Sequence, residues 1–147
     1  MLLVGSSGGH LAQLVALEDW YAGRERSWVT FDTPDARSSL EGEDVVYAHY
    51  PTTRNIPNLL RNTALAFRLV RRHRPATIVS TGAGVALPFF VLGRLMRIQT
   101  VYVEVYDRVD TATMTGRLCR PFTDLMLVQW PEQLGLYRGA RLIGPLL

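Results

Sequence analysis

Short apolar runs alternate with longer segments of helical periodicity along the whole chain. The apolar runs predict strands at 2–5, 27–31, 44–48, 77–80, 100–105, 125–128 and 141–143. Helical spacing follows the first strand as far as Tyr21, covers 58–73, follows Gly84 as far as Met96, and covers most of 111–122. Nearly continuous apolar strands are typical of a parallel sheet buried on both faces. The alternation therefore predicts an α/β fold, a Rossmann-like, doubly wound parallel sheet with strand order three-two-one-four-five-six.

Two glycine-rich segments follow the first and the fourth strand. They read Gly5-Ser6-Ser7-Gly8-Gly9-His10 and Thr81-Gly82-Ala83-Gly84. In the expected strand order these two strands are neighbours at the switch point, where ligands bind beyond the carboxyl ends of the strands. Such loops direct backbone N–H groups and the positive end of a helix dipole at one point, which suits a phosphate or a diphosphate. The alternative is a pair of turns that only pack tightly.

His10 ends the first of these loops, in the first turn of the helix that follows. The helix dipole at that position favours the neutral imidazole, which is the form that a general base requires. The alternative is a solvated residue at the start of the helix. We expect His10 to face the switch point as a general base.

Composition and charge exclude several classes of protein. Of the 147 residues, 48% are apolar and 20% charged, which is typical of one globular domain with its own core. All 16 cationic residues are arginine, a side chain that grips phosphate in a bidentate fork, although a GC-rich genome also explains the lack of lysine. The formal net charge of +3 is too small for a nucleic-acid-binding protein, and no basic–aromatic stripe is present.

Cysteine, histidine and hydropathy limit the compartment and the cofactors. The single cysteine, Cys119, excludes an intrachain disulfide and suits a reducing cytosol, where we expect it to pack in a helix. His49 and His73 lack partners at metal-ligand spacing, so no metal site is expected. The first strand leaves no room for a signal peptide, and the apolar stretch at 85–95 is too short to cross a bilayer. These features predict a cytoplasmic or peripheral protein.

A dinucleotide site is one alternative at the first loop. Its fingerprint requires glycine at the positions of Gly5, Ser7 and His10, and only the first of these is glycine. Asp32, at the end of the second strand, stands where an acid that binds ribose is placed in such folds. A free-standing oxidoreductase therefore remains an alternative function. A Walker phosphate loop is excluded, because no Gly-Lys-Ser/Thr sequence occurs.

Five ordered motifs carry a resemblance to a known family. They are Gly5-Ser6-Ser7-Gly8-Gly9-His10, Ser80-Thr81-Gly82-Ala83-Gly84-Val85, Val103-Glu104-Val105-Tyr106-Asp107-Arg108-Val109, Thr115-Gly116-Arg117-Leu118 and Val128-Gln129-Trp130-Pro131-Glu132. Together they resemble the Alg14 family, which includes bacterial exopolysaccharide and capsule subunits of the PssD, EpsE and CpsF kind. More distantly, the first two motifs resemble the glycine loops of MurG, the peptidoglycan N-acetylglucosaminyltransferase. The resemblance covers nearly the whole chain.

The resemblance implies that residues 1–147 are the N-terminal half of a GT-B glycosyltransferase, inverting and metal-independent, with no further cofactor. Such a half binds a polyprenyl-diphosphate-linked sugar as acceptor, while a separate subunit of the Alg13 or PssE kind binds the UDP-sugar. A chain of one Rossmann-like domain agrees with a split enzyme. Because it lacks the membrane anchor of eukaryotic members, we expect it at the inner face of the cell membrane as a peripheral protein. A non-catalytic scaffold that recruits the transferase is a further alternative.

The resemblance also implies roles for individual residues. His10 takes the proton from the acceptor hydroxyl. Glu104, on the ligand side at the end of the fifth strand, orients that hydroxyl or assists His10, and its alternative is an ion pair with Arg108. Gln129 and Trp130 face the partner, unless Trp130 is ordinary core. The acceptor diphosphate is held by the two glycine loops and one arginine: Ser6, Ser7, Gly8, Gly9, Thr81, Gly82, Gly84 and Arg108. The sequence leaves open whether His10 or Glu104 is the base.

The helix at 58–73 carries a separate signal. At 3.6 residues per turn, a core face is predicted for Leu59, Ala66, Phe67 and Val70. An arginine row with two leucines beside it lies opposite: Arg61, Arg68, Arg72, Leu65 and Leu69. Arginines flanked by leucines suit the surface of an anionic membrane, and a solvated basic face is the alternative.

Overall fold

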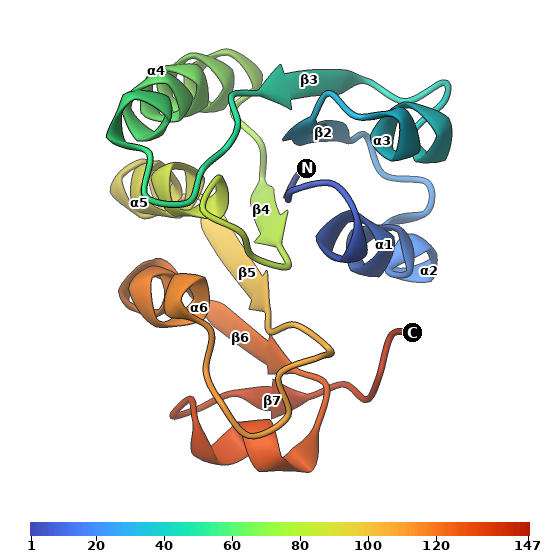
Figure 1. The fold of residues 1–147 in the computed structure, drawn as a ribbon, viewed down its shortest axis with the longest axis vertical. Helices are drawn as coiled ribbons and strands as arrows, with labels where there is room; N and C mark the ends of the chain where they lie inside the picture. Colours follow the sequence, from blue (N-terminus) through green and yellow to red (C-terminus); the bar gives the residue numbers. More distant parts are fainter.

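Seven parallel strands form one sheet in the order β3-β2-β1-β4-β5-β6-β7, as the computed structural model of all 147 residues shows (Figure 1). The predicted order is confirmed, and the seventh strand is a short edge strand. The strands are β1 (Leu2–Val4), β2 (Ser27–Phe31), β3 (Val45–Ala48), β4 (Thr77–Ser80), β5 (Gln99–Val103), β6 (Leu125–Val128) and β7 (Arg141–Leu142). A Rossmann-like sheet of this kind matches the predicted fold class.

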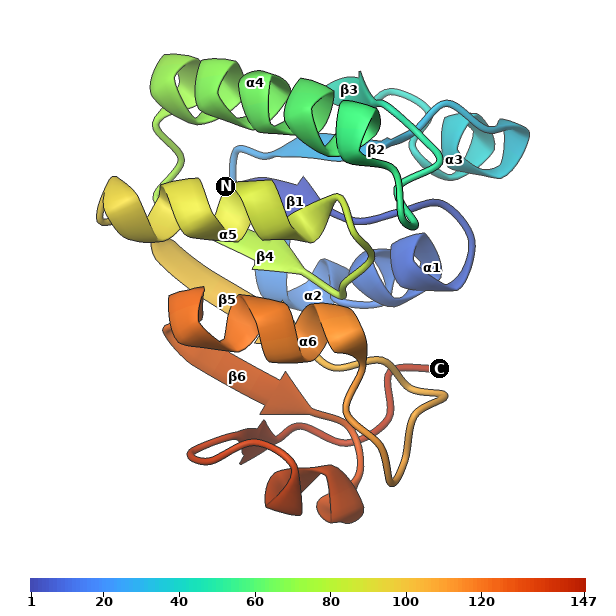
Figure 2. The same ribbon diagram turned by 60° about the vertical axis from the view of Figure 1, so that its left-hand side comes forward.

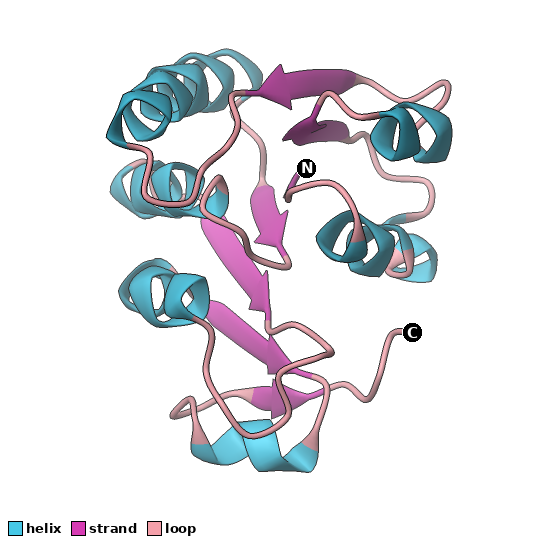
Figure 3. Cartoon of the chain, in the orientation of Figure 1, coloured by secondary structure: helices cyan, strands magenta, loops and turns pink.

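Helices cover both faces of the sheet. On one face lie α1 (Gly9–Val15), α2 (Glu18–Tyr21) and α3 (Pro34–Ser39), and on the other α4 (Ile56–His73), α5 (Ala86–Leu95) and α6 (Met114–Cys119) (Figures 1 and 3). Two short 3-10 helices, η1 (Arg120–Phe122) and η2 (Pro131–Gly135), complete the chain. This division follows from right-handed connections between parallel strands, because the direction of winding reverses at β1.

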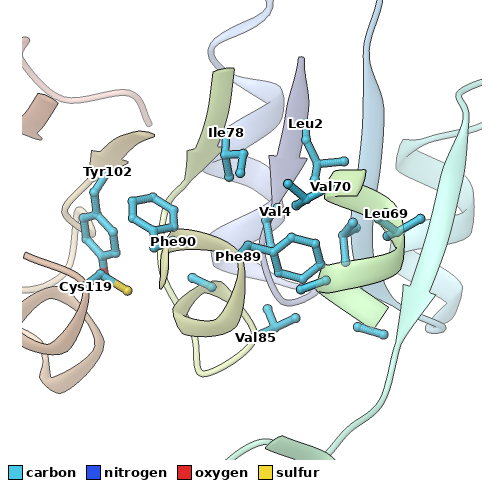
Figure 4. Close-up of a cluster of buried hydrophobic side chains, with 14 of the residues drawn as sticks. Leu2, Val4, Leu69, Val70, Ile78, Val85, Phe89, Phe90, Tyr102 and Cys119 are labelled. Carbon is cyan, nitrogen blue, oxygen red and sulfur yellow. The ribbon is translucent and has the colours of Figure 1, made fainter. Parts of the chain in front are cut away.

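The core consists of two layers, because alternate residues of each strand face opposite sides. Leu2, Val4 and Ile78 point towards α4 and α5, where they pack with Val70 and Phe89 (Figure 4). Residues of the other layer face α1–α3: Leu3, Leu11, Leu14, Tyr21, Trp28, Ala36, Leu40, Val79 and Val101. The larger layer therefore lies under the three helices α4, α5 and α6.

The helix after β1 is shorter than the sequence predicts. Helical spacing continues to Tyr21, but the structure has two helices, α1 and α2, joined at Ala16 and Leu17. The change of direction lets the Tyr21 ring pack edge-on against Trp28, with ring centroids 5.8 Å apart, and lets its hydroxyl donate to the Val15 carbonyl. Packing against β2 therefore overrides local periodicity here. The predicted segment 111–122 likewise divides into α6 and η1.

The predicted faces of α4 are partly wrong. Ala66 and Val70 are buried as expected, but Leu65 and Leu69 are buried too, whereas Leu59 and Phe67 are exposed. Leu65 and Leu69 therefore cannot contact a membrane, and the buried face is rotated around the helix axis from the predicted one.

Two asparagines explain the shift of that face. Asn62 exchanges two hydrogen bonds of 2.8 Å with the backbone of His49, and Asn58 donates to the Pro51 carbonyl at 2.9 Å. Both side chains are buried because they satisfy the backbone of the connection that follows β3. Counting only apolar positions leaves these residues out of the buried face.

Part of the sheet remains uncovered on the α1–α3 face. There, over β5 and β6, lies a recess of about 250 Å³ that is lined only by apolar side chains. Its lining comes from α2 and the residue before it, from β4, β5 and β6, and from the C-terminal segment: Leu17, Trp20, Val79, Val101, Val103, Leu125, Leu127, Ile143 and Leu146. Separately, none of the helices has the length and hydropathy that crossing a bilayer requires.

Candidate active site

The two glycine loops lie side by side, as predicted. β1 pairs with β4 so that Val4 lies opposite Ser80, and both strands end at the same edge of the sheet. Two hydrogen bonds then join the loops: His10 Nδ1 lies 2.9 Å from the Thr81 carbonyl oxygen, and the Thr81 hydroxyl donates to the His10 carbonyl at 2.8 Å. His10 and Thr81 are therefore held as a pair.

This pair fixes the protonation pattern of the imidazole. A carbonyl oxygen only accepts, so Nδ1 of His10 carries the hydrogen that Thr81 receives. In the neutral ring, Nε2 is then the nitrogen with the free lone pair, and no hydrogen bond joins it to the chain. His10 is half-buried and lines a cavity of about 410 Å³ with Gln13, Tyr106 and Asp107. The geometry leaves Nε2 able to accept a proton from a bound hydroxyl.

In the first loop one backbone donor is taken by a side chain and others stay free. Gly8 adopts the left-handed φ of 70° that glycine permits, but its N–H donates to the Asp35 carboxylate at 2.8 Å. The N–H groups of Ser6, Ser7 and Gly9 donate to no acceptor in the chain. Gly9 is exposed with open space around it, and Ser6 and Ser7 are half-buried, with a single weak bond from Ser6 Oγ to the Ser7 carbonyl.

The second loop is shaped by close contacts on both sides. Gly82 has a φ of 113°, and a Cβ built on it would lie 2.8 Å from the Tyr102 hydroxyl and 3.2 Å from His10 Cε1. A Cβ on Gly84 would lie 3.0 Å from Thr52. Glycine is therefore required at Gly82 by both conformation and space.

Unpaired backbone donors are available at this second loop. The N–H of Gly82 is taken by Ser80 Oγ, but the N–H groups of Ala83, Gly84 and Val85 donate to no acceptor in the chain. They precede the ten-residue helix α5, whose dipole adds positive potential at that end. Free donors at a helix start suit an anion.

The structure does not bring Glu104 to His10. Its side chain points to the α4–α6 face, fully buried, where it accepts hydrogen bonds from the backbone N–H of Val105, from the N–H and hydroxyl of Thr113, and from the Tyr137 hydroxyl. Nor does it form the alternative ion pair with Arg108, whose exposed guanidinium has no partner in the chain. Glu104 does follow the carboxyl end of β5, as predicted, but its carboxylate is held within the core and contacts neither His10 nor Arg108.

Neighbouring groups respond to this buried carboxylate. Burial, and then the hydrogen bond to Glu104, raise the pKa of Tyr137 well above its usual value. Burial and, less strongly, Glu104 raise the pKa of the Cys119 thiol to about 12. Gly116 is part of the same packing, because a Cβ there would lie 2.6 Å from the Glu104 carboxylate. The cluster joins the loop after β5 to α6 and to the segment before β7.

Gln129 and Trp130, which were predicted to face the partner subunit, differ in how deeply they are buried. Gln129 is fully buried: its amide donates to Gln13 at 2.6 Å and to the Glu104 carbonyl at 2.9 Å. It therefore cannot contact another protein directly, and the prediction for Gln129 is wrong. Trp130 is half-buried, with its Nε1 donating to the Tyr106 carbonyl at 2.7 Å and its ring tilted against the Tyr106 ring.

Three residues near the site were not singled out from the sequence. Gln13 lies one turn after Gly9 and links α1 to the Tyr106 backbone, so it supports the wall of the His10 cavity. Asp107 lines that cavity from within a motif already quoted, and Arg54 lies beside the second loop in a region of turn-forming residues. The i to i+3 spacing of His10 and Gln13 was the available signal for Gln13. No three His, Cys, Asp or Glu side chains are grouped as a metal site requires.

Comparisons with known proteins agree with this architecture. A family model described as "Oligosaccharide biosynthesis protein Alg14 like" matches residues 46–146. A UDP-N-acetylglucosamine transferase subunit ALG14 from Eremothecium gossypii is 36% identical over 104 residues, which are 63% of this chain and 46% of that protein. The human subunit of the same name is 25% identical over 89% of this chain and 75% of its own length.

A solved structure shows the same fold. MurG from Acinetobacter baumannii superposes with a TM-score of 0.78 at 16% identity, over 97% of this chain and 44% of that one. The chain thus spans less than half the length of this structure and of the Eremothecium relative. At this identity the superposition establishes the fold, a GT-B N-terminal half, and leaves the chemistry to be argued from the site.

Proposed function

The chain belongs to the Alg14-like family of oligosaccharide biosynthesis proteins, and from that premise we propose that it is the acceptor-binding subunit of a two-component, inverting glycosyltransferase. Its acceptor is a sugar linked to a polyprenyl diphosphate, and a separate Alg13- or PssE-like subunit binds the UDP-sugar. In the reaction, Nε2 of His10 takes the proton of the acceptor hydroxyl while the hydroxyl oxygen attacks the anomeric carbon and UDP leaves. No metal takes part.

One observation carries the proposal. The hydrogen bond from His10 Nδ1 to the Thr81 carbonyl leaves Nε2 as the free ring nitrogen, and His10 lines a cavity at the switch point of the sheet. A packing role alone would not require a titratable ring with one nitrogen tied and the other free. Asp107 lines the same cavity and carries a charge opposite to that of the imidazolium that forms.

We assign the acceptor diphosphate to the second loop rather than to the first. Ala83 and Gly84, both half-buried, offer free N–H groups at the start of α5, and Arg54 lines a cavity together with Gly84. At the first loop, by contrast, the Asp35 carboxylate would repel a diphosphate. Gly82 separates the diphosphate from His10, so the acceptor sugar extends from the second loop into the His10 cavity.

We propose that α4 contacts the membrane, but through other apolar residues than the predicted Leu65 and Leu69. Ile56, Leu60 and Phe67 are exposed on the outward face, beside the exposed arginines Arg61, Arg68 and Arg72. Apolar side chains that enter the lipid, flanked by arginines at the headgroups, are typical of helices that lie on anionic membranes. Replacing the three arginines by glutamate should release the chain from anionic liposomes in a sedimentation assay.

The partner contact is proposed for the apolar recess over β5 and β6. Parallel sheets are normally covered on both faces, and here Leu125 and Leu127 are only half-buried, with the exposed Trp20 and Ile143 lining the same recess. Trp130 remains a candidate for the edge of that interface. Ile143→Asp should weaken the complex, because it would bury a charge without a partner.

Two other functions predict different results. As an oxidoreductase the chain would need Asp32 for ribose, but both oxygens of Asp32 accept hydrogen bonds from Arg37, at 2.6 and 2.9 Å. As a scaffold it would bind the partner without needing His10. Reconstitution distinguishes all three.

The experiment is calorimetric titration of the purified chain with UDP-N-acetylglucosamine and with NAD, alone and after addition of a PssE-like partner, followed by a transfer assay. We expect neither ligand to bind the lone chain and both complex formation and transfer to appear with the partner. Tight binding of UDP-sugar by the lone chain would contradict the split enzyme, and tight binding of NAD would favour the oxidoreductase.

A further inference from the structure

A second cavity lies on the other side of the second glycine loop from His10. It is a groove of about 330 Å³ between the N-terminal ends of α4, α5 and α6, which lie next to one another in Figure 2. Gly84 and Thr52 form its wall towards the loop. The loop therefore separates two cavities, one that contains His10 and one that does not.

The groove is apolar along most of its length. Ile56 and Leu59 line it from α4, and Met114 and Leu118 line it from α6, each pair on one helix face. Met114 is 71% exposed and Ile56 69%, and with Leu59 and Leu118 they form one contiguous apolar lining. Such a surface favours an apolar occupant.

The charge at the groove is one-sided. Arg54 is the single charged residue in its lining, and no carboxylate belongs to it. Arg54 and Gly84, whose N–H is free, both line the groove. An occupant with an anionic head and an apolar chain matches this arrangement.

The groove is also continuous with the surface that faces the bilayer in our proposal. Ile56 belongs both to the groove and to the exposed apolar face of α4 that continues with Leu60 and Phe67. A chain that leaves the lipid at α4 therefore has apolar side chains, Ile56 and Leu59, beside it as it enters the groove that Gly84 also lines.

We propose that this groove binds the first prenyl units of the acceptor lipid, with Arg54 and the second loop on its diphosphate. The inference rests on the proposed function, which sets the order of the acceptor's groups along the protein. The sugar lies at His10, the diphosphate at Gly84 and the prenyl chain between α4 and α6. The groove then selects acceptors by their lipid, independently of the sugar.

The test measures binding rather than transfer. The full chain is titrated with farnesyl diphosphate, below the concentration at which it forms micelles, and with inorganic diphosphate. We expect farnesyl diphosphate to bind at least about tenfold more tightly, because the prenyl chain is removed from water. The double variant Met114→Gln, Leu118→Gln should lose most of that advantage and keep its affinity for inorganic diphosphate.

Two further variants control for folding and for the head group. Leu95→Gln replaces a leucine that is 73% exposed at the far end of α5, outside the groove, and should bind both ligands as the unmodified chain does. Arg54→Ala should lower the affinity for both farnesyl diphosphate and inorganic diphosphate. Equal melting temperatures establish that the variants are folded.

The outcomes separate the groove from the proposed function. The proposed prenyl site is wrong if the double variant still binds farnesyl diphosphate more tightly than inorganic diphosphate by the same factor. It is also wrong if Leu95→Gln loses that factor as fully as the double variant does. Both conclusions hold whatever the transfer assay gives. If the preference depends on Met114 and Leu118 but no transfer occurs with any partner, the groove stands and the catalytic proposal fails.

Discussion

His10 and Glu104 occupy similar positions in the sequence and opposite situations in the structure. Each follows the end of a strand, β1 or β5, at the edge of the sheet where ligands bind. The imidazole of His10 has one tied and one free nitrogen in an open cavity, whereas both oxygens of Glu104 are surrounded by donors in a closed core. The difference shows that a position at a strand end does not by itself distinguish a catalytic residue from a structural one. The groups that contact the side chain make that distinction.

The two regions meet at one residue. Gly82 lies between His10 and Tyr102, and the Tyr102 hydroxyl is 3.4 Å from the hydroxyl of Thr113, which binds Glu104. Substitutions at Glu104, at His10 and at Gly82, where the two regions meet, therefore test the comparison. A structural carboxylate should affect unfolding first, and a base should affect turnover first.

The largest effect is expected for Glu104→Ala. It leaves the hydroxyls of Thr113 and Tyr137 without their acceptor in a buried place, so the free energy of unfolding should fall by about 3–5 kcal/mol. Urea denaturation followed by circular dichroism measures this. Glu132→Ala, at an exposed position, should change it by less than about 0.5 kcal/mol. A stable but inactive Glu104→Ala would restore Glu104 as a candidate base.

The second effect is on turnover. With the partner present, His10→Ala should lower the transfer rate by about 10²-fold or more, because the base is removed. His10→Asn is the sharper variant, since an asparagine amide can still donate to the Thr81 carbonyl but cannot act as a base. It should be as inactive as the alanine variant and as stable as the unmodified chain. Activity within a few-fold in His10→Asn would exclude His10 as the base.

The fold was predictable because it depends on features that repeat. Each strand is a run of apolar residues, so strand number, order and the adjacency of the two glycine loops follow from pattern and from the rules of parallel sheets. What failed depends on single side chains. Asn58 and Asn62 are polar yet buried on α4, and Tyr21 turns a helix to reach Trp28. Such contacts between distant residues leave no periodic signal.

Within the site, only the contact between the two glycine loops could be predicted from the sequence. His10 and Thr81 meet because their strands are adjacent, which the strand order already implies. The burial of Glu104 and Gln129 depends instead on Tyr137 and Gln13, which come from distant parts of the chain. A family motif marks such residues as important but does not say whether they contact substrate or the core.

The third effect lies at the contact between the two regions. Gly82→Ala puts a Cβ 2.8 Å from the Tyr102 hydroxyl at a φ of 113°, so it should cost about 1–3 kcal/mol of unfolding free energy and also displace His10. Gly135→Ala is the matched control, because a Cβ there meets no atom within 4 Å and Gly135 lies outside the His10 cavity. If Gly82→Ala changed neither stability nor transfer, the two regions would not be coupled through this loop.

The smallest effect is a dependence of stability on alkaline pH that belongs to the Glu104 region alone. Burial raises the pKa of Cys119 to about 12, whereas an unfolded thiol has a pKa of about 8.5. The folded protein thus keeps a proton that the unfolded chain loses, so stability is complete below pH 8.5 and falls above it by up to about 1.4 kcal/mol per pH unit. The only other side chains that contribute in this range are tyrosines whose pKa burial raises, such as Tyr137 and Tyr102, and their contribution is smaller because an unfolded tyrosine has a pKa of about 10. Urea unfolding at about pH 8.5 and 9.5 should show the full fall in the unmodified chain and in His10→Asn and a clearly smaller one in Cys119→Ala. The same slope in Cys119→Ala would mean that another group beneath α6 carries the proton.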